Sequence, residues 1–111
     1  MEVVSRARRD EVWLVALDPS RGSEIRKTRP CLIASPDEMN ESLQTLLVAP
    51  MTTTPRSYPT RVSLTFRGKS GQIALDQLRA IDRQRLGRKL GTIPAKTAQE
   101  VSSVLVEMFV R

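Results

Sequence analysis

The chain has 111 residues, a formal net charge of +6, no histidine and one cysteine. This length suits one domain with a single modest core, and one cysteine excludes an internal disulfide. The lack of histidine excludes histidine-based proton transfer and Ser–His or Cys–His nucleophiles, and with a lone cysteine it makes a zinc site implausible. Any chemistry must therefore come from arginines, lysines, carboxylates and hydroxyls, and we expect no cofactor and no metal.

The N-terminal residues are basic and are not followed by the apolar stretch of a signal peptide. No apolar run in the sequence approaches the length that spans a bilayer. We expect residues 1–9 to form a poorly ordered basic tail and residues 10–111 to form one domain. We also expect a cytoplasmic protein that makes no membrane association.

Five segments carry the apolar runs or the alternation that are typical of β-strands. The clearest alternation of apolar and polar side chains runs from Arg61 to Phe66, and it indicates a strand with one buried and one solvated face. The strands are expected at residues 11–17, 30–35, 45–52, 61–66 and 72–78.

The connections and the C-terminus carry turn and helix signals. Residues 37–42 are expected to be a polar connection, residues 68–71 a hairpin link and residues 90–93 a short extended piece. Pro94 suits the first turn of a helix. The apolar residues that follow have the i, i+3, i+4, i+7 spacing of one helical face: Val101, Val104, Leu105 and Met108. The sequence therefore predicts a mainly β fold, a strongly bent antiparallel sheet or barrel capped by a C-terminal helix.

Basic residues gather in two short segments. One lies between residues 21 and 29 with the single acid Glu24, and the other lies between residues 79 and 89 with the single acid Asp82. Because Lys and Arg neutralise phosphates and release counterions, two such clusters on a small domain favour a polyanionic partner. The alternative is a solvated basic surface that serves solubility.

Several polar side chains stand at strand ends or interrupt a strand. Pro30 biases Arg29 toward an extended backbone at a strand start, where the guanidinium either presents a planar fork to a phosphate or pairs with a carboxylate such as Asp76. Thr52 closes the third strand, and its hydroxyl either donates to a phosphate or stabilises a turn. Asp76 and Gln77 interrupt an otherwise apolar strand, which either structural hydrogen bonds or ligand binding would explain.

Four motifs occur together in the order and spacing of one protein family. They are the strand around Trp13, Gly22-x-Glu24-x4-Arg29-Pro30, Pro50-x-Thr52-Thr53 and Asp76-Gln77-x-Arg79-x-Ile81-Asp82. None of these motifs is specific alone. Together, over about residues 10–110, they resemble the MazF/PemK family of toxin endoribonucleases.

The resemblance implies an SH3-like barrel of the CcdB/PemK/MazF toxin type, a homodimer, and sequence-selective cleavage of single-stranded RNA, including mRNA. It also implies a cognate antitoxin, for which the basic clusters favour an acidic, disordered tail. The family's catalytic arginine and threonine fall on Arg29 and Thr52, and its loop carboxylate falls on Glu24. Some members carry an arginine two positions before the Asp-Gln pair and a histidine in the loop, whereas this chain has Ala74 and Ser23 there.

RNA supplies its own nucleophile, the 2′-hydroxyl, so the site needs a base and positive charge beside the phosphoryl oxygens. We expect Arg29 to stabilise the negative charge on the phosphoryl oxygens, with Thr52 as a second donor. We expect Glu24 to be the base, with Asp76 as the second candidate for that role. Contacts to the RNA are expected from a wider set: Arg21, Ser23, Arg26, Lys27, Thr53, Arg56, Asp76, Gln77, Arg83 and Arg85.

Two other functions stay open on the sequence alone. One is a non-catalytic gyrase poison of the CcdB type, against which Arg29-Pro30 and the strand end at Thr52 both argue. The other is an inactive nucleic-acid-binding module, which an RNA cleavage assay would distinguish from a nuclease.

Overall fold

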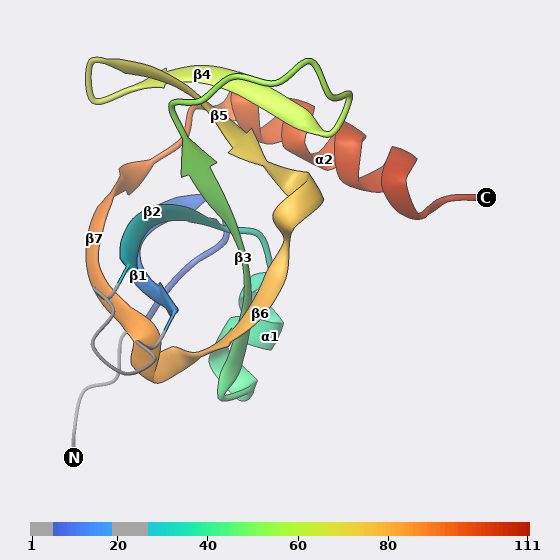
Figure 1. The fold of residues 1–111 in the computed structure, drawn as a ribbon. Helices are drawn as coiled ribbons and strands as arrows, with labels where there is room; N and C mark the ends of the chain where they lie inside the picture. The colour runs from blue at the N-terminus through green and yellow to red at the C-terminus, as the bar shows by residue number, and fades with distance from the viewer. Residues whose placement is uncertain (1–5, 19–26) are drawn as a thin grey trace.

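The computed structural model describes residues 6–18 and 27–111 of the chain. In chain order the elements are β1 (Glu11–Asp18), β2 (Lys27–Ile33), α1 (Asp37–Ser42), β3 (Thr45–Thr52), β4 (Arg61–Phe66), β5 (Lys69–Ala74), the 3-10 helix η1 (Leu75–Gln77), β6 (Arg79–Asp82), the 3-10 helix η2 (Arg83–Arg85), β7 (Leu86–Thr92) and α2 (Ala95–Phe109). Figure 1 shows the strands curling around a common interior, with α2 and the β4–β5 hairpin at one end and α1 at the other.

The seven strands form one antiparallel sheet in the order β4-β5-β3-β2-β1-β7, and β6 pairs with β3 beside this path. Strand β3 holds the barrel together because it pairs with three neighbours. Its first half pairs with β6, its last two residues pair with β5, and β2 runs along its opposite edge. The mainly β fold with a C-terminal helix, predicted from the sequence, is confirmed.

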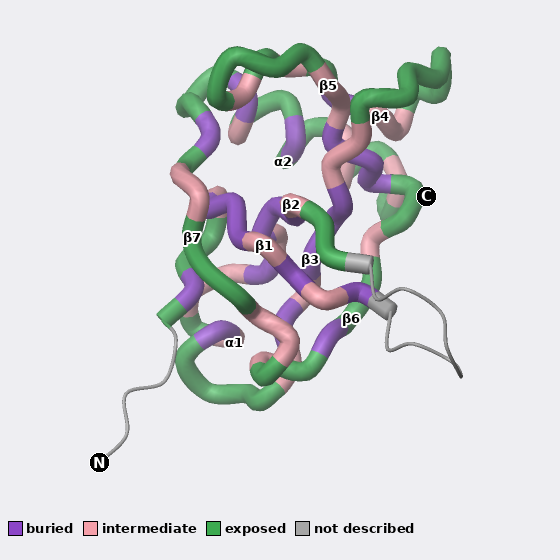
Figure 2. The backbone as a smooth tube through the Cα atoms, turned by 60° about the vertical axis from the view of Figure 1, so that its left-hand side comes forward, coloured by how far each residue is buried: buried purple, intermediate pink, exposed green. Residues whose placement is uncertain are grey.

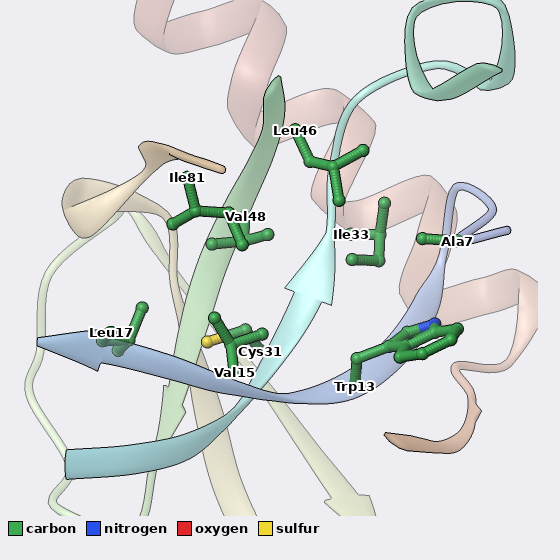
Figure 3. Close-up of a cluster of buried hydrophobic side chains, with 9 residues drawn as sticks. All are labelled: Ala7, Trp13, Val15, Leu17, Cys31, Ile33, Leu46, Val48 and Ile81. Atoms are coloured by element: carbon green, nitrogen blue, oxygen red, sulfur yellow. The ribbon is translucent and has the colours of Figure 1, made fainter. Parts of the chain in front are cut away.

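Two hydrophobic clusters lie on opposite faces of this bent sheet, because successive side chains of a strand point to opposite sides. On β1, Trp13 and Val15 belong to the first cluster and Val12 belongs to the second. Figure 3 shows the side chains of the first cluster converging from β1, β2, β3 and β6. Helix α2 covers the second cluster through its buried residue Val101.

Residues 6–9, which the sequence assigned to a basic tail, contact the barrel in the structure. Ala7 is buried in the first hydrophobic cluster. The backbone N–H of Arg8 donates to Oε1 of Glu11 at 2.9 Å, and that of Arg9 donates to Oδ1 of Asp37 at 2.8 Å. The packing of the domain therefore begins before residue 10.

The polar connection expected at residues 37–42 is the short helix α1. Acidic residues occupy its first turn, where the helix dipole favours negative charge. Its buried Asn40 donates to the backbone carbonyl of Ser35 at 3.0 Å and accepts from the Ser35 hydroxyl. This pair of hydrogen bonds satisfies polar groups inside the fold and anchors the helix to the end of β2.

The prediction of a strand over residues 72–78 was wrong for the second half of that segment. Strand β5 ends at Ala74, and the next three residues form η1. Asp76 and Gln77 are therefore exposed in a helical turn and do not interrupt a strand. The spacing of apolar residues in this segment fits both geometries, so the sequence pattern alone could not separate them.

Strands β5 and β7 are both longer at their starts than the sequence predicted. Residues 69–71, expected in the hairpin link, already belong to β5, and β7 covers residues 86–92 instead of only 90–93. The hairpin turn is made by Arg67 and Gly68, both with positive φ. Glycine tolerates this backbone region without steric cost, which explains the tight turn.

Helix α2 is 15 residues long, and among the described residues no helix is both long and apolar enough to cross a bilayer. Figure 2 shows that the buried positions follow the strands around the interior, whereas the chain near its C-terminus is exposed. Three large apolar side chains at this end of α2 are exposed: Val106, Phe109 and Val110.

Gly71 permits the close approach of β5 to the end of β3. A Cβ atom at this position would lie 2.8 Å from the backbone carbonyl oxygen of Thr52, which is closer than real Cβ contacts. We expect Gly71→Ala to lower the free energy of unfolding by about 1–3 kcal/mol, as overpacking does, because a backbone atom must shift. Urea denaturation would measure this change, with the exposed neighbour Ser70→Ala as the control. Equal stability of the two variants would contradict the close approach.

Candidate active site

A pocket of about 250 Å³ opens where several strands end close to one another. Its lining residues are Leu17, Arg29, Pro50, Thr52, Thr54, Arg56, Arg61, Ala74 and Gln77. These residues come from the end of β1, the first part of β2, the end of β3 and the loop after it, the start of β4, the end of β5, and η1. Three of them are arginines, and no carboxylate is among these described lining residues, so the pocket suits an anion.

The register of two strands brings Arg29 and Thr52 to this pocket. Strands β2 and β3 are antiparallel, with Cys31 opposite Pro50. Two residues further along, this register places Arg29 across from Thr52, with both side chains on one face. The pairing to β3 ends at Cys31 and the next residue is Pro30, which has no N–H to extend a ladder. Arg29 is exposed there and faces the pocket.

The hydroxyl of Thr52 is oriented by the backbone that follows it. Its Oγ1 accepts a hydrogen bond from the N–H of Thr54 at 3.0 Å. A hydroxyl has one proton to donate in addition to its acceptor sites, and within the described part of the chain this proton has no acceptor. Thr52 can therefore donate to an anion in the pocket.

A side-chain amide fixes the loop that follows β3. Gln72, on β5, accepts from the backbone N–H of Arg56 at 3.1 Å and donates to the backbone carbonyl of the same residue at 3.2 Å. This pair of hydrogen bonds holds the backbone of Arg56 beside the pocket that its exposed side chain lines.

An ion pair between Arg61 and Asp76 borders the pocket. Nε of Arg61 donates to Oδ1 of Asp76 at 2.8 Å, and Nη2 donates to Oδ2 at 3.3 Å. Nη1 donates to the amide oxygen of Gln72 at 3.3 Å, and the hydroxyl of Thr60 donates to Oδ1 of Asp76 at 3.1 Å. The hydrogen bond from Arg61 lowers the pKa of the Asp76 carboxyl below its ordinary value, against the opposing effect of burial. The alternative pairing of Asp76 with Arg29, considered from the sequence, does not occur.

The cysteine of the chain takes no part in this site. Cys31 is fully buried in the first hydrophobic cluster, and burial raises the pKa of its thiol to about 12. A nucleophilic cysteine reacts as the thiolate, which this environment disfavours. Among the described residues there is also no group of three or more cysteines and carboxylates placed to hold a metal ion.

The structure describes only part of the site that the sequence predicted. It places Arg29, Thr52, Arg56 and Gln77 around the pocket, and Asp76 beside it. Thr53 is exposed and lines a separate hollow with residues of β4 and β5. Four predicted residues lie outside the described part of the chain, and for Lys27 only the backbone is described. The four are Arg21, Ser23, Glu24 and Arg26.

Two predicted RNA-contacting arginines lie elsewhere. The guanidinium of Arg83 donates to the backbone carbonyls of Asn40 and Leu43, beside the start of β3 and therefore at the end of that strand remote from the pocket. The guanidinium of Arg85 donates to the backbone carbonyl of Ala16 at 3.1 Å. Both side chains bind the protein backbone, and neither lines the pocket.

Two polar residues of the pocket lining, Thr54 and Arg61, were missed by the sequence analysis. Thr54 gave no separate signal, because the chain bends after Thr52 and the N–H of Thr54 turns back to the Thr52 hydroxyl. Arg61 was assigned to the solvated face of β4, but its side chain is only 5% exposed. Its location depends on the pairing of β4 with β5, which places it opposite Ala74.

The comparisons with known proteins agree on one family. A family described as "PemK-like, MazF-like toxin of type II toxin-antitoxin system" matches residues 8–109. The endoribonuclease PemK of Escherichia coli is 37% identical over 99 residues, covering 84% of this chain and 74% of that protein. The endoribonuclease MazF9 of Mycobacterium tuberculosis is 32% identical, covering 88% and 92%. A chain in the crystal structure of MazE–MazF from Deinococcus radiodurans superposes with a TM-score of 0.81 at 27% identity, covering 94% and 96%.

Proposed function

The chain belongs to the PemK-like, MazF-like family of toxins of type II toxin–antitoxin systems, and from this membership we propose that it is a sequence-selective, metal-independent endoribonuclease for single-stranded RNA. Its relatives in Escherichia coli and Mycobacterium tuberculosis are named endoribonucleases. The observation that carries the proposal is the cationic pocket whose lining includes both Arg29 and Thr52.

The proposed reaction is an in-line transfer of the phosphoryl group within the RNA. The 2′-oxygen attacks the adjacent phosphorus, its proton passes to a base, and the bond from phosphorus to the 5′-oxygen breaks as that oxygen takes up a proton. The products are a 2′,3′-cyclic phosphate and a 5′-hydroxyl. Arg29 stabilises the negative charge that grows on the phosphoryl oxygens, and the hydroxyl of Thr52 is the second donor. Because guanidinium groups supply this positive charge, the reaction needs no metal ion.

We assign the role of base to Glu24. The other candidate, Asp76, is already bound by Arg61 and Thr60, and the hydrogen bond from Arg61 lowers the pKa of its carboxyl. A carboxylate with a lowered pKa is ionised but binds a proton weakly, which makes it a poor base. Asp76 therefore orients its neighbours in this proposal.

Selectivity for an RNA sequence is assigned to the loops beside the pocket. Arg56 lies on the loop that Gln72 fixes, and Gln77 lies on η1; both line the pocket. Arginine and amide side chains can contact the exposed base edges and phosphates of single-stranded RNA. The substrate is cellular RNA, including mRNA, which places the activity in the cytoplasm.

The proposed partners are a second copy of the chain and an acidic antitoxin. The exposed apolar side chains at the end of α2, Val106, Phe109 and Val110, offer a surface for a dimer. The structural relative from Deinococcus radiodurans is a MazE–MazF complex. An acidic, disordered antitoxin tail would be attracted to the arginines of the pocket as RNA is, because electrostatic complementarity favours any polyanion.

Cleavage should proceed in excess EDTA. Purified protein incubated with a long single-stranded RNA should cut it at defined sites and leave 2′,3′-cyclic phosphate and 5′-hydroxyl ends, while single-stranded DNA of the same sequence stays intact because it lacks the nucleophile. Primer extension would map the cuts, and end-labelling would identify the termini. Loss of cleavage in EDTA with recovery in magnesium would refute the mechanism. Absence of any cleavage would favour the gyrase poison or the inactive binding module.

Arg29→Ala should lower the rate of RNA cleavage at least about 10²-fold without unfolding the domain, by analogy with the loss of one preorganised oxyanion donor. Lys27→Ala, two residues away, should have a much smaller effect that appears mainly in salt-dependent binding. Single-turnover kinetics would measure the rates, and circular dichroism would monitor folding. If both variants lost the same modest activity, Arg29 would act only in binding.

The chain should behave as a dimer of 12.5 kDa subunits in light scattering. An acidic peptide from the C-terminal half of the cognate antitoxin should inhibit cleavage in competition with RNA, because both polyanions need the same cations. The same peptide with its acidic residues changed to amides is the control. A monomer that the acidic peptide does not inhibit would remove the partner half of the proposal and leave the nuclease half standing.

A further inference from the structure

We propose that Arg61 is a second phosphate-contacting residue of the pocket, and that Asp76 and Gln72 hold its guanidinium in place. This role rests on the proposed cleavage of RNA. Arg61 would then bind the phosphate in addition to forming the ion pair, and Asp76 would position Arg61.

The guanidinium of Arg61 has N–H groups for which the described residues offer no acceptor. It has five N–H groups. Nε and Nη2 bind the carboxylate of Asp76 in a side-on pair, and Nη1 binds the amide oxygen of Gln72. These bonds account for three N–H groups and leave one on each terminal nitrogen. Arg61 lines the pocket and also a second hollow between β4 and α2, and its side chain is 5% exposed.

The surroundings of Arg61 fix its orientation from several sides. The side chain starts opposite Ala74 on β5, whose methyl group also lines the pocket and leaves space for the larger side chain. Cζ of Arg61 lies over the ring of Tyr58, 5.2 Å from its centroid. A planar cation bound along its edge by Asp76 and beside an aromatic ring is preorganised for binding a further anion.

The charges around the pocket favour the binding of an anion. Three guanidinium groups line it, from Arg29, Arg56 and Arg61, and the carboxylate of Asp76 balances one of them. The remaining like charges repel one another, and this repulsion is relieved when a phosphate enters.

Three variants separate contact with the phosphate from a merely structural role. Arg61→Ala removes the cation, Arg61→Lys keeps the charge without the planar fork, and Asp76→Asn leaves the cation but removes its charged partner. Lys69→Ala is the control for net charge, because Lys69 is exposed on the same β4–β5 hairpin and lies outside the pocket. Thermal melting of each variant would establish that it folds.

Cleavage kinetics on the RNA that the wild type cuts provide the first readout. Arg61→Ala should lower kcat/KM about 10- to 100-fold, the range expected for losing a hydrogen bond to a charged group. Asp76→Asn should lower it less, because the cation stays in the pocket. Lys69→Ala should match the wild type. Wild-type kcat/KM in Arg61→Ala would overturn the proposal, and a larger loss in Asp76→Asn than in Arg61→Ala would contradict it, because the carboxylate would then act on its own and not through Arg61.

Binding of a 2′-deoxy analogue of that RNA, which lacks the nucleophile, provides the second readout. A single-stranded ligand that loses one phosphate contact should show a slope of log K against log salt that is smaller by about 0.7. We expect this change in Arg61→Ala and a normal slope in Arg61→Lys. A wild-type slope in Arg61→Ala would overturn the contact while leaving the nuclease intact, whereas a wild type that cuts no RNA would instead overturn the proposed function.

Discussion

The antiparallel register between β2 and β3 is the constraint on which the site depends. With Cys31 opposite Pro50, the same register carried toward the pocket sets Arg29 across from Thr52. The neighbouring residues Cys31 and Ile33 are fully buried in the first hydrophobic cluster. A slip of one residue would turn these side chains to the other face of the sheet and expose them, so core packing fixes the register. The positions of the two proposed catalytic side chains therefore follow from the burial of their neighbours.

The pocket lies where the apolar interior gives way to charged groups. Leu17 and Ala74 are buried and line it together with the exposed Arg29 and Arg56. The apolar part limits access of water on one side, which strengthens the attraction between the guanidinium groups and an anion. Asp76 balances part of the positive charge and orients Arg61 without entering the lining. The arrangement combines preorganised donors with an excess of positive charge, which is what stabilisation of a phosphoryl group requires.

Strands whose apolar and polar side chains alternate because one face is buried could be predicted from the sequence. Side-chain positions that depend on which strands pair could not. The alternation along residues 61–66 predicted β4 with correct bounds, because one face of that strand is buried. The same alternation assigned Arg61 to solvent, since its partner Asp76 is reached only when β4 pairs with β5. Leu75 is buried in a helical turn as it would be in a strand, so η1 was missed. Arg29 was assigned to the site from the resemblance to the family motif, and its exposed position in β2 fits the local restriction that Pro30 imposes on its backbone.

The most direct test of this account is the structure of the protein bound to an RNA that it recognises, with a 2′-deoxy nucleotide at the cleaved position. The account predicts that the scissile phosphate lies in the pocket, with its oxygens within about 3 Å of the guanidinium of Arg29 and of the hydroxyl of Thr52. An RNA that lies on another face of the barrel, or whose scissile phosphate contacts neither of these two groups, would contradict it.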